Sequence, residues 1–266
     1  MAIFETQNLA VGYTHGKQTT TLLSGLNLSL DSGQLVALLG QNGAGKSTLI
    51  RALTFATKPI EGKILLHGVD FDTITKSERA RLLGLVSTER IQAGALTVSE
   101  LVGLGRQPYT GFLGRLSDDD RAIVADAIRS VGMSHKAESF VANLSDGERQ
   151  KVMIARALAQ HTPIIVLDEP TAFLDAASRI ETMRLLAALA HEQGKAILLS
   201  THDISRSLML TDQLWVITRD RQVLTGATPE MVRSQAMNQV FANPSITFNP
   251  THCDYESTPP ENQTTL

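Results

Sequence analysis

The sequence predicts an α/β fold in which a mixed sheet carries a nucleotide-binding loop. Three apolar runs of four or five residues, each bounded by glycine or polar residues, are typical of buried strands: 35–39, 164–167 and 196–199. Between the second and third runs, an apolar periodicity of about 3.6 residues over 176–193 predicts an amphipathic helix. Its apolar face is formed by Ile180, Met183, Leu186 and Leu189.

The other elements follow from alternation and turn residues. Strand-like alternation covers 3–11 and 26–30, with glycine and threonine turns between them, and predicts an N-terminal antiparallel β region. A helix is predicted over 48–55 and a strand between two turns over 59–70. A mostly helical region, interrupted at 107–111, is predicted over 89–143, and a hairpin over 213–226. Residues 251–266 are polar and include Pro259-Pro260, which predicts a flexible tail.

Composition narrows the class of protein. The 266 residues are 42% hydrophobic and 19% charged, as expected of a globular chain that buries a substantial core. The net charge of −3 gives no basic surface for nucleic acid, so we expect no nucleic-acid partner. The single cysteine, Cys253, cannot form an internal disulfide, which suits a reducing compartment. The first residues lack a signal peptide, and no apolar run is long enough to span a membrane.

The loop after the first apolar run has the phosphate-binding pattern G-x-x-x-x-G-K-[ST]. Glycines let backbone N–H groups turn toward phosphates, and the start of the following helix adds positive partial charge. Lys46 is predicted to reach the β- and γ-phosphates of ATP, and Ser47 to offer its hydroxyl to Mg²⁺. The nine residues of the loop are Gly40, Gln41, Asn42, Gly43, Ala44, Gly45, Lys46, Ser47 and Thr48.

Two carboxylates follow the second apolar run. The run ends at Asp168-Glu169, and ligands of parallel sheets bind at the carboxyl ends of the strands. Asp168 is predicted to hold Mg²⁺ through its water shell, and Glu169 to act as the general base on the attacking water. An acidic pair at a strand end before a proline is common in itself. Its presence with the phosphate loop favours the catalytic interpretation.

The segment Leu144-Ser145-Asp146-Gly147-Glu148-Arg149-Gln150, called here the signature segment, contains S-x-x-E. This pattern is a helix capping box, so it predicts a helix start at Ser145 and Glu148. The same helix start, with Ser145 and the Gly147 backbone, can accept a γ-phosphate presented by another subunit. The structural and functional interpretations are compatible.

With the phosphate loop, the acidic strand end and the signature segment in this order, the chain resembles the ATP-binding-cassette (ABC) ATPases. The resemblance spans about residues 3 to 250. It implies one ABC ATPase domain over 1–250, with a phosphate-loop core, an N-terminal antiparallel β subdomain and a helical subdomain inserted at about 89–160. It also implies that two copies of the chain sandwich two ATP molecules, each between one copy's phosphate loop and the other's signature segment.

The resemblance assigns three further residues. His202, after the strand run 196–201, matches the histidine that contacts the γ-phosphate and positions the water. Asp175, in Ala172-Phe173-Leu174-Asp175, matches the loop that crosses the dimer interface. Tyr13 matches the aromatic residue that stacks on adenine.

The sequence departs from the family pattern at two positions. Thr88 stands where the family usually has a glutamine that touches Mg²⁺ and the water; either Thr88 offers one oxygen or Glu89 takes its place. Asp146 stands where glycine is usual. We expect the Asp146 carboxylate to point away from the nucleotide, because the γ-phosphate would repel it.

Within the family, Leu104-Gly105-Arg106-Gln107-Pro108-Tyr109-Thr110-Gly111 resembles the helical subdomain of importers of ferric siderophores, haem and cobalamin. That subdomain meets the membrane subunits. The implied partners are a second copy of the chain, integral-membrane permease subunits and, indirectly, a substrate-binding protein. The implied location is the cytoplasmic face of the inner membrane.

Function is therefore predicted as ATP hydrolysis that drives import of an iron chelate through a separate permease. Haem or cobalamin import is an alternative, as is a soluble ABC ATPase of a scaffold such as iron–sulfur assembly. DNA-repair and translation-factor ABC proteins generally have tandem cassettes, which this chain lacks. A regulatory, non-hydrolysing subunit is disfavoured by the intact Lys46, Asp168, Glu169 and His202.

Overall fold

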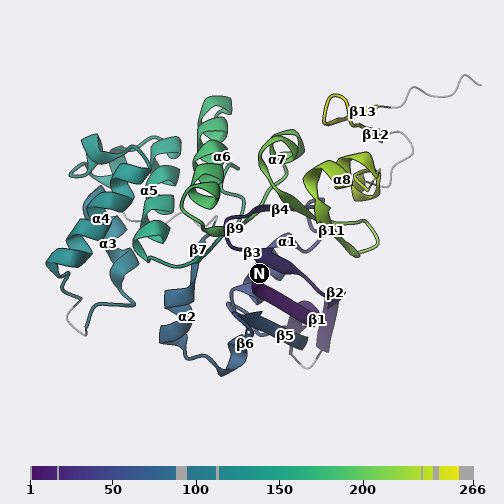
Figure 1. Cartoon of the computed structure of the whole chain (residues 1–266), viewed down its shortest axis with the longest axis horizontal. Coiled ribbons are helices and arrows are strands. Elements are labelled where there is room, and N and C mark those ends of the chain that lie inside the picture. Colours follow the sequence, from purple (N-terminus) through teal and green to yellow (C-terminus); the bar gives the residue numbers. More distant parts are fainter. Residues whose placement is uncertain are drawn as a thin grey trace, which may run out of the picture.

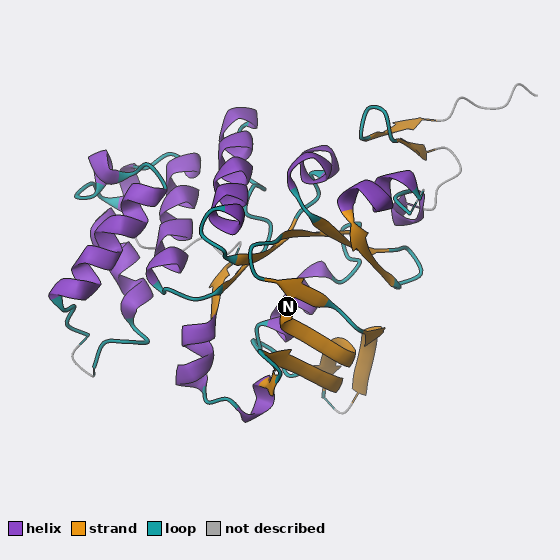
Figure 2. Cartoon of the chain, viewed as in Figure 1, coloured by secondary structure: helices purple, strands orange, loops and turns teal. Residues whose placement is uncertain are grey.

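A computed structural model describes residues 2–16, 18–87, 95–111, 114–234, 236–241 and 246–257. A central sheet separates an all-helical lobe from an antiparallel sheet, and a short hairpin stands at the far end (Figure 1). Figure 2 shows that strands dominate one side of the molecule and helices the other. The two core clusters of buried apolar side chains lie on opposite faces of the central sheet.

The central sheet has six strands in the order β11-β10-β4-β9-β8-β7. Five are parallel, and β11 pairs antiparallel with β10, so the sheet is mixed as predicted. The three apolar runs of the sequence are its middle strands, and each is buried along its whole length. In spatial order the strands are Val223–Ala227, Gln213–Ile217, Leu35–Leu39, Ala196–Ser200, Ile164–Leu167 and Leu83–Val86.

The N-terminal sheet is antiparallel, with the order β2-β1-β5-β6 and β3 paired to β1. Its strands are β1 (Ala2–His15), β2 (Gln18–Leu26), β3 (Ser29–Asp31), β5 (Glu61–Leu66) and β6 (Val69–Asp70). The prediction missed β2, because it took the threonines of this segment as turn residues. Thr19, Thr20 and Thr21 instead pair with the end of β1, where β-branched side chains suit an exposed hairpin. Helix α1 (Lys46–Leu53) packs between this sheet and the central one.

The helical lobe consists of α3, α4 and α5 with three short 3-10 turns, on one side of Figure 1. Helix α5 packs against both α3 and α4, around a core that includes Leu101, Ile128 and Val152. The predicted helical region began at 89, but residues 88–94 lie outside the described part of the chain. The elements are α3 (Val98–Gly103), η2 (Leu104–Arg106), α4 (Asp118–Ser130), η3 (Ser134–Lys136), η4 (Val141–Asn143) and α5 (Asp146–Ala159).

Helix α6 (Ala176–His191) covers the central sheet and confirms most of the predicted apolar face. Met183, Leu186 and Leu189 are buried, but Ile180 is 38% exposed, so the prediction is wrong there. Ile180 lies six residues before Leu186, which places it about 120° away around the helix axis. Its side chain therefore lies outside the buried face. The other helices are η1 (Phe71–Thr73), α2 (Lys76–Leu82), α7 (Ile204–Leu210), α8 (Thr228–Arg233) and α9 (Asn238–Phe241).

A hairpin is formed by β12 (Ile246–Asn249) and β13 (Asp254–Ser257), of which β13 lies within the predicted flexible tail of residues 251–266. Phe248 is buried, and the Tyr255 hydroxyl donates to the Met237 carbonyl, so packing orders this hairpin where composition predicted none. Residues 258–266 lie outside the described part. No helix among the described residues is long and apolar enough to cross a membrane.

Candidate functional site

The phosphate loop joins β4 to α1 and closes around its own lysine. Gly43 and Gly45 have φ of 79° and 112°, a region that favours glycine, which explains two of the three glycines of the loop. The Lys46 Nζ donates to the Gly40 carbonyl at 2.8 Å and to the Gln41 carbonyl at 3.3 Å. The side chain is only 5% exposed, so the ammonium lies inside the loop.

Two carboxylates act on this ammonium. Burial lowers the pKa of Lys46 from its ordinary value, while Glu169 and Asp168 partly oppose the shift by favouring the charged form. The Glu169 Oε1 is 3.9 Å from the Lys46 Nζ. The loop thus holds a desolvated cation next to the strand-end carboxylates, and phosphate oxygens are its natural ligands.

Asp168 follows β8 at the carboxyl end of the sheet, as predicted. Its N–H donates to the Val86 carbonyl at 2.9 Å, and its Oδ1 accepts from the Ser200 hydroxyl at 2.6 Å and the Ser47 hydroxyl at 3.4 Å. Two of the three predicted metal-binding side chains, Ser47 and Asp168, are therefore together. A hydroxyl and a carboxylate that converge on one point fit Mg²⁺, which takes few protein oxygens and completes its shell with water and phosphate.

The position of Glu169 is fixed through its main chain. The residue adopts a φ of 45°, an uncommon conformation for a residue with a side chain, and its N–H donates to the Ser200 hydroxyl at 2.9 Å. Its Oε2 lies 3.6 Å from the His202 Nδ1, so the two predicted catalytic residues are neighbours. Ser200 was missed by the sequence analysis, although its place at the end of β9, beside β8, could have identified it.

The signature segment forms the start of α5. Ser145 is the N-cap, and the predicted capping box is present: the Glu148 N–H donates to Ser145 Oγ at 3.3 Å and the Ser145 N–H to Glu148 Oε2 at 3.0 Å. A hydrogen bond from Lys136, then one from the Ser145 backbone, lower the pKa of Glu148. Asp146, the unusual residue, pairs with Arg149 at 3.4 Å along its own helix.

The absence of a side chain at Gly147 leaves room for the neighbouring helix α6. A Cβ at this position would lie 2.7 Å from the Ser178 hydroxyl in the first turn of α6. That turn is capped by Asp175, whose Oδ1 accepts from the Ser178 N–H at 2.8 Å, and these bonds lower the pKa of Asp175. The dimer-interface residue and the signature segment implied by the resemblance are therefore adjacent in one chain.

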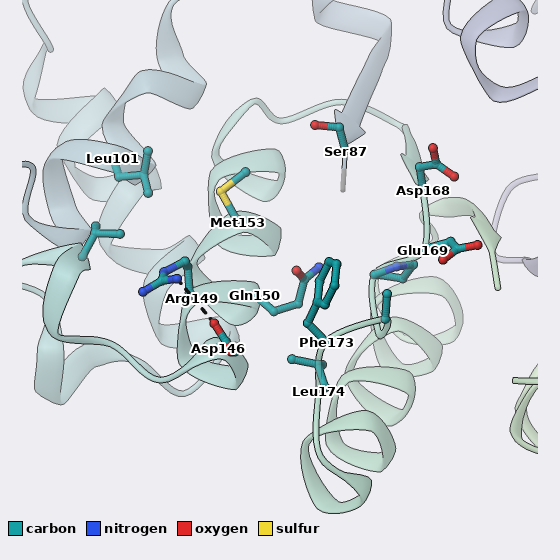
Figure 3. Close-up of a pocket in the computed structure, with 13 residues that line it drawn as sticks. Ser87, Leu101, Asp146, Arg149, Gln150, Met153, Asp168, Glu169, Phe173 and Leu174 are labelled. Carbon is teal, nitrogen blue, oxygen red and sulfur yellow. Dashed lines mark hydrogen bonds and ion pairs between the residues drawn. The ribbon is translucent and has the colours of Figure 1, made fainter. Parts of the chain in front are cut away.

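A cavity of about 60 Å³ separates the signature helix from the strand-end carboxylates (Figure 3). Asp168 and Glu169 lie on one side of it, and Asp146, Arg149 and Gln150 on the other. The first turn of α5 thus does not complete the phosphate site of its own chain.

One predicted residue, Tyr13, lies at the margin of the site. Tyr13 is 55% exposed on the β1–β2 hairpin, and Leu22 and Leu23 of the same hairpin pack next to Gly45 of the phosphate loop. Thr88 lies outside the described residues. A further contact was not predicted: the Gln41 side chain donates to the Val240 carbonyl of α9 at 3.2 Å, which links the phosphate loop to the C-terminal region.

This arrangement of phosphate loop, carboxylates and capped signature helix can be compared with known proteins. The sequence profile described as ABC transporter matches residues 23–172. The chain belongs to the ABC transporter family. It is an ABC ATPase that binds ATP, with the mixed and antiparallel sheets of that cassette.

Relatives and solved structures extend this match over most of the ABC ATPase. The achromobactin transport ATP-binding protein of Dickeya dadantii is 34% identical over 91% of this chain and 88% of that protein. The iron(3+)-hydroxamate import ATP-binding protein of Bacillus subtilis is 33% identical over 91% of this chain and 88% of that protein. A dimeric ATP-binding cassette in a post-hydrolysis state with ADP and Pi has a TM-score of 0.70 and 27% identity, covering 85% of this chain and 98% of that one.

Proposed function

We propose that this ABC ATPase powers import of an iron chelate of the ferric siderophore type through separate membrane permease subunits. The observation that carries the ATPase part is the cluster of Lys46, Ser47, Asp168, Glu169 and His202 at one edge of the central sheet. The cargo is supported by the relatives, whose names specify achromobactin and iron(3+)-hydroxamate. Haem or cobalamin as cargo is the alternative.

The loop residues bind and orient ATP. The N–H groups of residues 40–48 and the buried Lys46 ammonium contact the phosphates, and Tyr13 stacks on the adenine ring. Lys46 must leave the Gly40 and Gln41 carbonyls to do so, and a phosphate oxygen replaces those acceptors. Because the ammonium is already desolvated, little solvent has to be removed when phosphate arrives.

Ser47 and Asp168 hold Mg²⁺, which supplies charge neutralisation on the phosphate oxygens when it is bound. Glu169 accepts a proton from the attacking water, and His202, 3.6 Å from its carboxylate, positions that water against the γ-phosphate. Ser200 holds the Asp168 carboxylate and the Glu169 backbone through its two hydrogen bonds.

The other half of the site comes from a second copy of the chain. Ser145, the Gly147 backbone and the first turn of α5 of that copy close on the γ-phosphate, with Glu148 fixing the turn and Asp175 crossing the interface. ATP binds the closed pair better than the open one, and hydrolysis removes the contacts that hold it closed.

The helical lobe passes this closure to the permease subunits. We place the pair of ATPases at the cytoplasmic face of the inner membrane, with a substrate-binding protein delivering the chelate on the other side. The support for this arrangement is the family and the transport and import functions in the names of the relatives.

The ATPase mechanism is tested by Glu169→Gln. General-base catalysis contributes about 10²- to 10⁴-fold, so we expect a loss of that order in turnover with ATP binding retained. Size measurements with and without ATP should show an ATP-dependent dimer. Glu192→Gln, an exposed residue just after α6, is the matched control and should hydrolyse ATP normally. A Glu169→Gln variant that is monomeric with ATP would contradict the sandwich.

The cargo is tested by uptake of a radiolabelled ferric siderophore in cells that lack this chain. Wild-type protein should restore uptake and Lys46→Ala should not. Normal uptake without the chain would leave the ATPase mechanism standing but exclude this cargo. Labelled haem and cobalamin would then be measured in the same strains.

A further inference from the structure

The segment 104–111, which carries the resemblance to metal-chelate importers, packs in part against its own chain: Gly105 and Arg106 are buried, while Leu104 and Gln107 are exposed. It follows α3 and contains η2, and its residues contact the last turn of α5 and helix α2. The resemblance implied a role at the membrane subunits. Three of its residues, Gly105, Arg106 and Tyr109, also make contacts inside the molecule.

Gly105 allows an unusually close backbone approach. A Cβ at this position would lie 2.3 Å from the Arg156 carbonyl and 3.1 Å from the Ala159 Cβ, both in the last turn of α5. No flexible side-chain end is involved in the first of these contacts, so any larger residue must push the two backbones apart.

Arg106 and Tyr109 cap the same end of α5. The Arg106 Nη1 donates to the Ala159 carbonyl at 2.9 Å, and the Tyr109 hydroxyl donates to the Gln160 carbonyl at 3.1 Å. These are carbonyls that a helix leaves unsatisfied at its C-terminus. Arg106 is itself fixed by a 2.8 Å ion pair with Asp120 of α4, and both residues are buried.

The same segment is tied to the core lobe. Arg81 of α2 donates to the Pro108 carbonyl from Nε at 3.1 Å and from Nη2 at 2.9 Å, and its guanidinium carbon lies 5.1 Å from the centre of the Tyr109 ring. The Gln160 amide donates to the Ala80 carbonyl at 2.6 Å. It also donates to the Leu83 carbonyl, at the start of β7, at 3.2 Å.

We propose that Arg81, Gly105, Arg106, Tyr109 and Gln160 form a lobe brace that positions the signature segment for ATP-dependent pairing. The brace holds the C-terminal end of α5 against α2 and β7 of the core, while the N-terminal end of the same helix carries Ser145. Its members are positioning residues, because they act through α5 and do not contact the nucleotide.

The physical reason lies in the symmetry of the proposed pair, on which this inference rests. A twofold pair uses one surface twice, so each chain must present its phosphate loop and its signature segment at a fixed separation. Helix α5 has 14 residues and spans about 21 Å, so a small rotation at its braced end becomes a displacement of Ser145 at the other. Loosening the brace therefore weakens pairing without touching the phosphate loop.

The test uses Arg81→Ala, which removes an exposed side chain and should leave the fold intact, and Tyr109→Phe, which removes a single hydrogen bond. The control is Arg121→Ala, because the Arg121 side chain bonds only near its own helix start, to Leu116 and Asp118. Each variant is compared with wild type in monomer ATP affinity, in ATP-dependent dimer affinity in the Glu169→Gln background, and in the interlobe distance.

The interlobe distance is measured by double electron–electron resonance between spin labels at Asp119→Cys in α4 and Glu192→Cys after α6, with Cys253→Ser. We expect Arg81→Ala to broaden the distance distribution and to weaken the dimer about tenfold, with unchanged monomer ATP affinity. Tyr109→Phe should do the same to a smaller extent, and Arg121→Ala should match wild type.

An unchanged distance distribution in Arg81→Ala would overturn the brace, and so would a broadened distribution with unchanged dimer affinity. Failure of the proposed function would look different. In that case the Glu169→Gln protein with an intact brace would not pair with ATP at all.

Discussion

The two halves of the proposed ATP site differ in how they are held. At the edge of the central sheet, Lys46 is held by carbonyls of its own loop and lies near Glu169, and Asp168 is fixed by bonds from β7, β9 and the phosphate loop. At the start of α5, the bonds of Ser145 and Glu148 stay within their own turn and reach one neighbour in the same lobe, Lys136. The first, here called the core half, is preorganised in the monomer. The second, here called the docking half, is a surface that a second chain can contact.

This difference explains why one chain contains both halves of the proposed site although they do not come together within that chain. A buried ammonium must be surrounded by acceptors in the monomer, because an unpaired buried charge is costly. An exposed helix start can leave its N–H groups to water until a phosphate replaces it. The core half therefore forms on folding, and in the proposed pair the docking half works only when a second chain presents ATP to it.

Breaking the core half should have the largest effect. Lys46→Ala removes charged hydrogen bonds to the phosphates, which we expect to weaken ATP binding by about 2–3 kcal/mol, or roughly 30- to 150-fold. Titration calorimetry of the monomer measures this directly. Lys63→Ala, an exposed lysine paired with Asp70 on the N-terminal sheet, is the control. Equal ATP affinities in the two variants would show that Lys46 does not contact the phosphates.

A smaller effect is expected when the support of the carboxylates is removed. Ser200→Ala leaves the Glu169 N–H without its acceptor and Asp168 without its shortest donor, at a cost of about 1–3 kcal/mol in the free energy of unfolding. Urea unfolding would measure the loss. Ser130→Ala, at the exposed end of α4, should be nearly neutral, so equal midpoints for the two variants would argue against this network.

A substitution at Gly147 can displace the start of α5 without changing the charge of the docking half. Gly147→Ala brings a Cβ within 2.7 Å of the Ser178 hydroxyl, so α5 and α6 must move apart, with an expected cost of about 1–2 kcal/mol after the helix-propensity gain. Ser178→Ala removes the clashing hydroxyl. A double-mutant cycle should therefore give a favourable coupling energy, and additive effects would exclude the clash.

The smallest effect is expected at the buried ion pair of the helical lobe. Hydrogen bonds from the Ser117 hydroxyl and backbone, and then from Arg106, lower the pKa of Asp120 to about 2. The ionised form is thus favoured in the fold, and its contribution is present above the ordinary pKa and is lost as pH falls toward the folded value. Asp120→Asn should flatten the loss of stability between about pH 4 and pH 2. An unchanged slope would contradict this assignment.

Much of the fold followed from local patterns. Buried strands such as Leu35–Leu39 are apolar on both faces, and the phosphate loop is a contiguous set of residues, so sequence order alone places them. The capping box at Ser145 was predicted for the same reason, since its two partners are three residues apart. The missed features depend on distant neighbours: Thr20 becomes a strand residue because it pairs with Tyr13, and Ser200 matters because β9 lies beside β8.

The sequence by itself therefore determined the nucleotide chemistry of this ABC ATPase. Lys46 and the Asp168-Glu169 pair belong to short motifs whose geometry is set by neighbouring backbone. Tertiary structure alone decided that Ser200 joins the Asp168 carboxylate to the Glu169 backbone and that Arg106 and Tyr109 cap the end of α5. Such contacts join residues far apart in the chain, and their partners are fixed by how the helices and sheets pack, which no local pattern records.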